Sequence, residues 1–132
     1  MKIRRATKKD VQELAELDKE AHKEIVWWVP MKPYEFSRLI KKRFVDVAIE
    51  DGKIIGYINW NIKNNQLTLD NLYIKREFRK QGLGKKMINK FMSELKTSRF
   101  KEVRIDCPES LRKFYENLGF KVTGLIMKRK LR

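Results

Sequence analysis

The stretch LTLDNLYIKREFRKQGLGKKMINK, residues 67–90, constrains the fold of this chain more than any other part of the sequence. Its first eight residues have the leucine-rich, aromatic and β-branched composition that favours a strand. Beyond Gly84, apolar residues recur at steps of three and four, which indicates one buried helical face. These residues are Met87, Ile88, Phe91, Met92 and Leu95. The sequence therefore predicts a strand, a basic turn and then a helix.

The turn between these two elements is suited to holding an anion. A helix start leaves backbone N–H groups unpaired and carries the positive end of the helix dipole. Glycines at that start let a phosphate approach the backbone closely. Seven Lys and Arg residues lie between positions 75 and 90 against one acid, Glu77. This excess of positive charge favours a ligand with several phosphates. The residues of the turn are Arg79, Lys80, Gln81, Gly82, Leu83 and Gly84.

Two well-known phosphate-binding loops do not fit this turn. The dinucleotide fingerprint requires a third glycine where Met87 stands. A P-loop requires glycine in place of Arg79 and Ser or Thr in place of Lys86. The pattern that remains is R-x-x-G-x-G between a strand and a helix. The alternative interpretation is a glycine-containing helix start on a solvated cationic surface.

A second informative segment, LRKFYENLGF, occupies residues 111–120. Its apolar residues Leu111, Phe114, Tyr115 and Leu118 share one face of a short helix. Gly119 is placed to end that helix, because glycine readily adopts the left-handed conformation common there.

The two segments together, in this order and at this spacing, resemble the GCN5-related N-acetyltransferase (GNAT) superfamily. The resemblance covers most of the chain, with its specific motifs in residues 67–95 and 103–120. It implies acetyl-CoA as co-substrate, with the diphosphate bound by the loop. It also implies that Tyr115 protonates the departing CoA thiolate. The cofactor-binding residues expected in the loop are Arg79, Lys80, Gln81, Gly82, Leu83, Gly84 and Lys85.

The remaining elements predict an α/β acetyltransferase fold in a single domain, residues 1–132. We expect a mixed, mostly antiparallel sheet with a splayed central pair of parallel strands, flanked by about four helices. Asp51-Gly52 is a strong hairpin signal, and Thr7 with Asp10 resembles a capping box at a helix start. Pro30 and Pro33 interrupt regular structure before a second short helix. The further strands are predicted at residues 1–6, 44–50, 53–62, 103–107 and 120–131.

The strand at residues 67–74 contains an irregularity. Leu67 and Leu69 share one parity, whereas Leu72 and Ile74 share the other. A regular strand with one buried face does not change sides, so an extra residue near Asp70, a β-bulge, is predicted. The alternative is a strand buried on both faces. The resemblance implies a strand that bulges and splays, so that the backbone of Leu72, Tyr73 and Ile74 can bond the pantetheine arm.

The catalytic base is less defined than the acid. Several members of the family carry a glutamate where Thr68 stands, and threonine cannot take up the proton. Asp70 is our first candidate and Asp106 the second. A water-mediated route without a dedicated base, and a purely structural Tyr115, are the alternatives.

The acceptor groove is expected beside the aromatic segment that joins the first two helices. The resemblance implies that Trp27, Trp28 and Tyr34 shape this groove. The alternative is that at least one tryptophan belongs to the core. The expected acceptor is a primary amine: a peptide N-terminus, a lysine or a small-molecule amine.

Composition sets further bounds. One cysteine and one histidine build neither an internal disulfide nor a common zinc site, so no metal is expected. No apolar run approaches the ~20 residues of a membrane span, and no signal core follows the basic N-terminus. We therefore expect a cytoplasmic protein that does not bind membranes, with a homodimer as one option.

The net charge of +15 is spread along the whole chain. A CoA site explains only part of it. The charge could attract nucleic acid or acidic partners, or could serve solubility alone. The rival interpretation of function is therefore a basic module of the same fold that binds RNA or a ribosomal or other protein partner without catalysis.

Overall fold

The computed structural model describes residues 1–25 and 29–132. The strands are β1 (Lys2–Arg5), β2 (Val45–Glu50), β3 (Lys53–Lys63), β4 (Gln66–Ile74) and β5 (Arg104–Ile105). The helices are α1 (Val11–Glu24), α2 (Pro33–Lys41), α3 (Leu83–Leu95) and α4 (Arg112–Glu116), with short 3-10 turns η1 (Lys8–Asp10), η2 (Arg76–Phe78) and η3 (Glu109–Leu111). The five strands form one sheet in the order β1-β2-β3-β4-β5, antiparallel except for the parallel pair β4–β5. This confirms the predicted fold class.

Local signals in the sequence explain two of the element boundaries. Asp51 and Gly52 adopt left-handed backbone angles, φ 50° and 74°, as a tight β2–β3 hairpin requires. The predicted capping box is present: Asp10 accepts a hydrogen bond from the N–H of Thr7 at 2.7 Å and opens the turn into α1.

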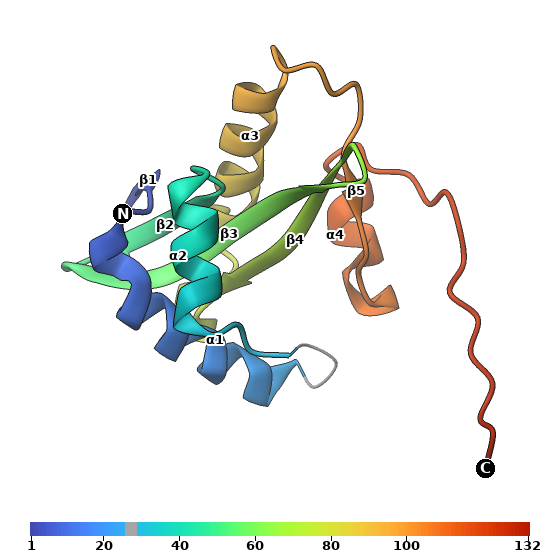
Figure 1. Ribbon diagram of the computed structural model, residues 1–132, viewed down its shortest axis with the longest axis horizontal. Coiled ribbons are helices and arrows are strands. Elements are labelled where there is room, and N and C mark those ends of the chain that lie inside the picture. The colour runs from blue at the N-terminus through green and yellow to red at the C-terminus, as the bar shows by residue number, and fades with distance from the viewer. Residues whose placement is uncertain (26–28) are drawn as a thin grey trace.

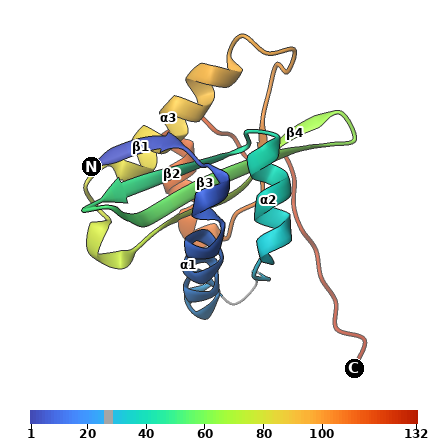
Figure 2. The same ribbon diagram turned by 60° about the vertical axis from the view of Figure 1, so that its left-hand side comes forward.

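The sheet is covered on both faces (Figures 1 and 2). Helices α1 and α2 lie on one face and bury residues such as Leu14 and Phe36 against Tyr57. Helix α3 lies on the other face, where Phe91 packs on Trp60 with the ring centroids 4.8 Å apart. None of the helices in the described residues is long and apolar enough to cross a membrane.

The predicted β-bulge is confirmed at Asp70. Asn59 of β3 pairs with Asn71, whereas the next residue, Trp60, pairs with Leu69, which leaves Asp70 as the extra residue. As a result, the leucines before the bulge and the apolar residues after it pack into the same core, against α3. Those residues are Leu67, Leu69, Leu72 and Ile74.

A buried charge cluster ties α3 to the sheet. Asp46 is fully buried and accepts hydrogen bonds from Arg5 Nε at 2.7 Å and Lys90 Nζ at 3.1 Å. Glu94 pairs with the same two cations from the solvent side. Asp46 therefore links β1, β2 and α3.

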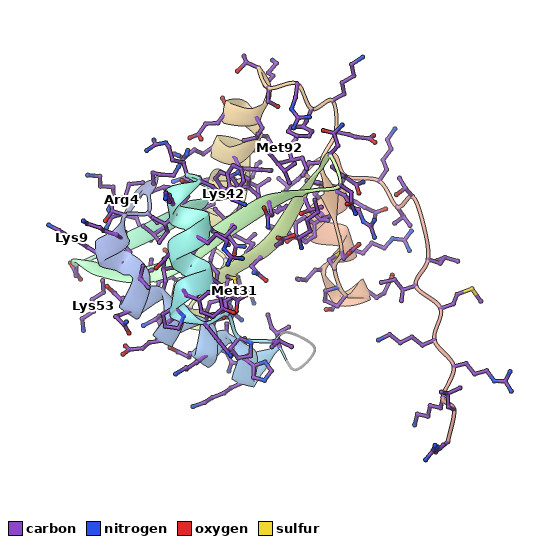
Figure 3. All side chains as sticks on the ribbon, in the orientation of Figure 1. Arg4, Lys9, Met31, Lys42, Lys53 and Met92 are labelled. Carbon is purple, nitrogen blue, oxygen red and sulfur yellow. The ribbon has the colours of Figure 1, made fainter. Side chains whose placement is uncertain are left out.

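The strand predicted at residues 120–131 is wrong. Residues 121–132 have no regular secondary structure and are exposed (Figures 1 and 3). Two physical reasons are visible. The neighbouring strand β5 is only two residues long, and the apolar residues Leu125, Ile126 and Met127 are consecutive rather than alternating. The segment therefore has no single face to bury and little edge to pair with.

Candidate active site

The basic turn leads directly into α3, as the sequence predicts. Lys80 and Gly82 adopt left-handed conformations, φ 62° and 78°, and turn the chain into the helix. The first intrahelical bond runs from Lys86 N–H to the carbonyl of Gly82, 3.0 Å. The N–H groups of residues 83–85 precede that bond and point out of the helix start. The buried side chain of Leu83 anchors the turn in the core.

The charge around this helix start is positive. Lys80, Gln81 and Lys85 are exposed, and the first turn of α3 contains no acid. Among the ion pairs of the described residues, none involves Lys80, Lys85 or Lys86. These lysines therefore add to the positive potential of the free N–H groups.

Arg79, the first residue of the loop pattern, points elsewhere. Its Nη1 and Nη2 donate to the two carboxylate oxygens of Glu24 at 2.6 and 2.9 Å, and its Nε donates to the carbonyl of Ile74 at 2.8 Å. The structure therefore does not place Arg79 with the lysines at the helix start. Sequence reasoning missed Glu24, which ends α1 and carries no local signal of this contact.

The central strands separate as expected. The β4–β5 pairing consists of Thr68 with Arg104 and Leu69 with Ile105, and ends there. Lys75 N–H donates to Ile55 O at 2.8 Å. In an antiparallel pair the backbone N–H and C=O groups of every second residue point toward the partner strand, and those of the residues between point away. By this alternation the backbone of Tyr73 faces β3, while the backbone groups of Leu72 and Ile74 face the open edge.

Helix α4 closes the other side of this opening. A Cβ atom on Gly84 would lie 3.4 Å from Phe114 Cζ, 3.5 Å from Ile74 Cδ1 and 3.7 Å from Leu72 Cδ2. The start of α3, the open edge of β4 and α4 therefore meet at one glycine. The lack of a side chain there keeps the junction open to a ligand.

Tyr115 lies next to this junction. Its ring packs edge-on against Phe114 and Phe120, with centroids 5.0 and 5.6 Å apart. Burial raises the pKa of Tyr115 to about 12, with a smaller effect from the nearby Cys107. The hydroxyl is therefore protonated at neutral pH, as a proton donor must be.

An open pocket of about 550 Å³ lies beside the β4–β5 pair. Asp70 and Asp106, the two candidate bases, both line it, as do Thr68 and Val29. Each acid is paired with a cation: Lys63 Nζ lies 3.6 Å from Asp70 Oδ2, and Arg104 Nε lies 3.3 Å from Asp106 Oδ1. The pocket is thus polar, with charges of both signs.

The expected acceptor aromatics do not gather in this pocket. Tyr34 is 58% exposed and lies against Arg38, whose guanidinium carbon is 5.9 Å from the ring centroid. It is not among the described residues that line the pocket. Trp27 and Trp28 fall outside the described residues. The connection between α1 and α2 contributes Val29 instead.

Comparison with known proteins identifies the family. Residues 17–130 match the family described as the acetyltransferase (GNAT) domain. This chain belongs to the GNAT acetyltransferases. As a GNAT domain it is an acetyl-CoA-dependent N-acetyltransferase. Comparison of the sequence with curated proteins gives no match.

Solved structures show the same GNAT fold at low sequence identity. A tetramutant of the BH1408 protein from Bacillus halodurans is 20% identical, with a TM-score of 0.81, covering 99% of this chain and 100% of that one. The aminoglycoside N-acetyltransferase AAC(6')-Iy in complex with CoA is 17% identical, with a TM-score of 0.78 and 99% of each chain covered. A predicted acetyltransferase with acetyl-CoA from Clostridium acetobutylicum is 17% identical, with a TM-score of 0.74, covering 98% of this chain and 96% of that one.

Proposed function

We propose that this chain acts as one N-acetyltransferase domain that moves an acetyl group from acetyl-CoA directly to a primary amine in a ternary complex. The observation that carries the proposal is the meeting of the α3 start, the open edge of β4 and α4 at Gly84. The diphosphate would find free N–H groups there, the extended amide-containing arm would find an open strand edge, and the departing thiolate would find a proton donor.

The residues present fit acetyl-CoA. The N–H groups of residues 83–85, with Lys80 and Lys85, would hold the diphosphate. The backbone groups of Leu72 and the N–H of Ile74 on the open edge would bond the pantetheine arm, which is rich in amides, while the Ile74 carbonyl accepts from Arg79. Acetyl-CoA supplies an activated thioester, and the protein supplies position, since holding both substrates in place removes much of the entropic cost of reaction.

Tyr115 is proposed as the general acid. Attack of the amine on a thioester carbonyl ends with a departing thiolate that needs a proton. A buried phenol kept protonated by its surroundings can donate that proton. Tyr115 then regains a proton from solvent, so the enzyme is unchanged after each cycle.

Asp70 is proposed as the group that holds and deprotonates the acceptor amine, directly or through water. The acceptor arrives as an ammonium ion and must lose a proton before attack. Asp70 is the bulge residue of β4, and its side chain is 26% exposed, whereas that of Asp106 is 57% exposed. The less exposed carboxylate, Asp70, is more easily shielded from bulk water when the acceptor binds. Asp106 remains the second candidate.

The charges of the pocket indicate the class of acceptor. The acids suit an ammonium group, and Lys63 and Arg104 suit a carboxylate or carbonyl close to it. A peptide or a small amine that carries both polarities fits better than a polyamine, which the protein's charge of +15 would repel.

Release of free CoA thiol, measured with acetyl-CoA and a panel of amines, tests this proposal. We expect acceptor-dependent release, greatest with peptides or zwitterionic amines and reduced in Asp70→Asn. The rival basic module predicts no thiol release with any acceptor, together with salt-sensitive binding of RNA. That result would overturn the enzymatic proposal.

A further inference from the structure

Glu24, the last residue of α1, reaches across to the start of the cofactor loop. Its carboxylate receives a two-pronged pair of hydrogen bonds from Arg79, 55 positions later in the chain. It also accepts a hydrogen bond from the Tyr73 hydroxyl at 3.0 Å and lies 3.6 Å from Arg76. Planar pairs of this kind fix both the position and the orientation of the guanidinium group.

The oriented guanidinium in turn holds the strand. With both terminal nitrogens on Glu24, the Nε of Arg79 donates to the carbonyl of Ile74 at 2.8 Å. This carbonyl belongs to the last residue of β4 and faces the open edge. The Arg79 guanidinium also lies over the Tyr73 ring, 5.4 Å from its centroid. The loop after β4 is therefore attached both to the end of that strand and to α1.

We propose that Glu24 is a positioning residue for acetyl-CoA. By holding Arg79 it fixes the end of β4 and the first residue of the loop, so that the N–H groups of residues 83–85 and the open edge face one ligand together. Arg79 supports the loop instead of contacting the diphosphate. The inference rests on the proposed binding of acetyl-CoA at this site.

This arrangement has an energetic consequence. A loop of glycines and lysines loses conformational entropy when a ligand orders it, and a loop already ordered loses less. The contribution of Glu24 is thus preorganisation, which affects cofactor affinity. Among the contacts of the described residues, Glu24 touches neither the acceptor pocket nor Tyr115. The rate of the chemical step at saturating cofactor should therefore be preserved.

The test compares Glu24→Gln with Glu16→Gln, a matched change at an exposed position of the same helix. Calorimetry should show acetyl-CoA binding about tenfold weaker in E24Q, and unchanged in E16Q. In kinetics, KM for acetyl-CoA should rise by a similar factor while kcat at saturation stays within about twofold. Loss of the pair should lower the melting temperature of E24Q in either case, but a purely structural role would leave the acetyl-CoA affinity of the folded protein unchanged.

Arg79→Lys provides a second variant that keeps the positive charge but loses the planar fork. We expect it to weaken binding as E24Q does, and the double variant to be little worse than either single one, because both break the same pair. If Arg79 instead contacted phosphate, E24Q would free it and tighten binding, which would overturn the inference. Tyr73→Phe removes the hydroxyl hydrogen bond to Glu24 but keeps both the Glu24–Arg79 pair and the ring beneath the Arg79 guanidinium, so its effect on binding should be below about threefold.

Failure of the proposed function and failure of the positioning role of Glu24 give different results. If the wild-type protein does not bind acetyl-CoA, the proposed function fails. If the wild type binds and both E24Q and R79K bind equally well, only the positioning role of Glu24 fails.

Discussion

Gly84 at the start of α3 faces the ring of Phe114 on α4, and a Cβ atom on Gly84 would lie 3.4 Å from Phe114 Cζ. These two residues connect the motif at residues 79–84 with the motif at residues 114–120. The glycine leaves room on the helix start, and the aromatic ring forms the opposite wall. The two motifs that identify the family in the sequence thus form one junction in the structure.

Gly84→Ala should separate binding from stability. The added methyl group would meet only side-chain atoms at 3.4 to 3.7 Å, so we expect the free energy of unfolding to stay within about 1 kcal/mol of wild type. The same methyl group would occupy the junction between the α3 start, β4 and α4, where the cofactor is proposed to pass. Affinity for acetyl-CoA, measured by calorimetry, should fall by about tenfold or more, which corresponds to about 1.4 kcal/mol.

Gly82→Ala is the matched control for that variant. Nothing lies within 4 Å of a Cβ atom at Gly82, but its φ of +78° strains any residue with a side chain. We expect a loss of stability of about 1 kcal/mol in urea denaturation. If the two variants did not differ from each other in stability or in acetyl-CoA affinity, the geometry described for the helix start would be contradicted.

Tyr115→Phe should lower kcat by about 10²-fold and leave acetyl-CoA affinity nearly unchanged, because only the proton donor is lost. Since the pKa of Tyr115 is raised to about 12, its protonated form is lost only as pH rises toward that value. Wild-type kcat should therefore show no decline due to this group below about pH 10. Turnover of Y115F equal to wild type would remove Tyr115 from the mechanism.

Asp46→Asn should destabilise the fold without a direct effect on the site. The substitution leaves Arg5 and Lys90 without their buried carboxylate, and breaking such a pair costs about 3 kcal/mol. Urea denaturation would measure this loss. Asp51→Asn, in the exposed β2–β3 turn, is the control and should be nearly neutral, because asparagine tolerates the same left-handed conformation. A neutral D46N would contradict the proposed link between β1, β2 and α3.

The Glu24 pair should give the protein a specific dependence on acid. The hydrogen bonds from Arg79, and then from Tyr73, lower the pKa of Glu24 from 4.5 to about 2. The unfolded chain therefore takes up this proton first, so the stabilisation is complete above about pH 4.5 and is lost as pH falls toward 2. The full shift corresponds to about 3 kcal/mol, and the partial exposure of the pair reduces our expectation to about 1 kcal/mol.

The difference in unfolding free energy between wild type and Glu24→Gln, measured by urea denaturation across this pH range, checks the prediction. It should be constant from pH 5 to 7 and shrink below pH 4.5. A difference that persists unchanged at pH 2 would show that the charge of Glu24 is not its cause.

Removal of residues 121–132 should leave the melting temperature nearly unchanged. All of these residues are exposed, including Leu125 at 87% and Leu131 at 96%. Limited digestion with trypsin should cut at their lysines and arginines before any other part of the protein. A large fall in melting temperature on truncation would mean that the segment packs onto the fold after all.

Much of the fold follows from residues close together in the sequence. The parity change between Leu69 and Leu72 predicts the bulge, and Asp51-Gly52 predicts the hairpin, because each signal lies within the element that it shapes. The pairing of Glu24 with Arg79 has no such signal, since it depends on how α1 crosses the sheet. The meeting of Asp70 and Asp106 at one pocket likewise depends on the parallel pairing of β4 and β5.

The error at residues 120–131 has a related cause. An apolar and β-branched composition favours a strand only where a neighbouring edge is available to pair with. The length of that edge, two residues in β5, is a tertiary property that the composition of the segment does not reveal.

The bulge makes β4 sensitive to chain length in a way that its composition does not show. The fold alone would accept many side chains at position 70, since the residue is not part of the core. Deleting it would place Leu67, Leu69, Leu72 and Ile74 in one uninterrupted alternation, so these side chains would still face α3, but β4 would lose the local bend next to the point where its pairing with β5 ends. The bulge therefore determines the course of β4 and not which of its side chains are buried.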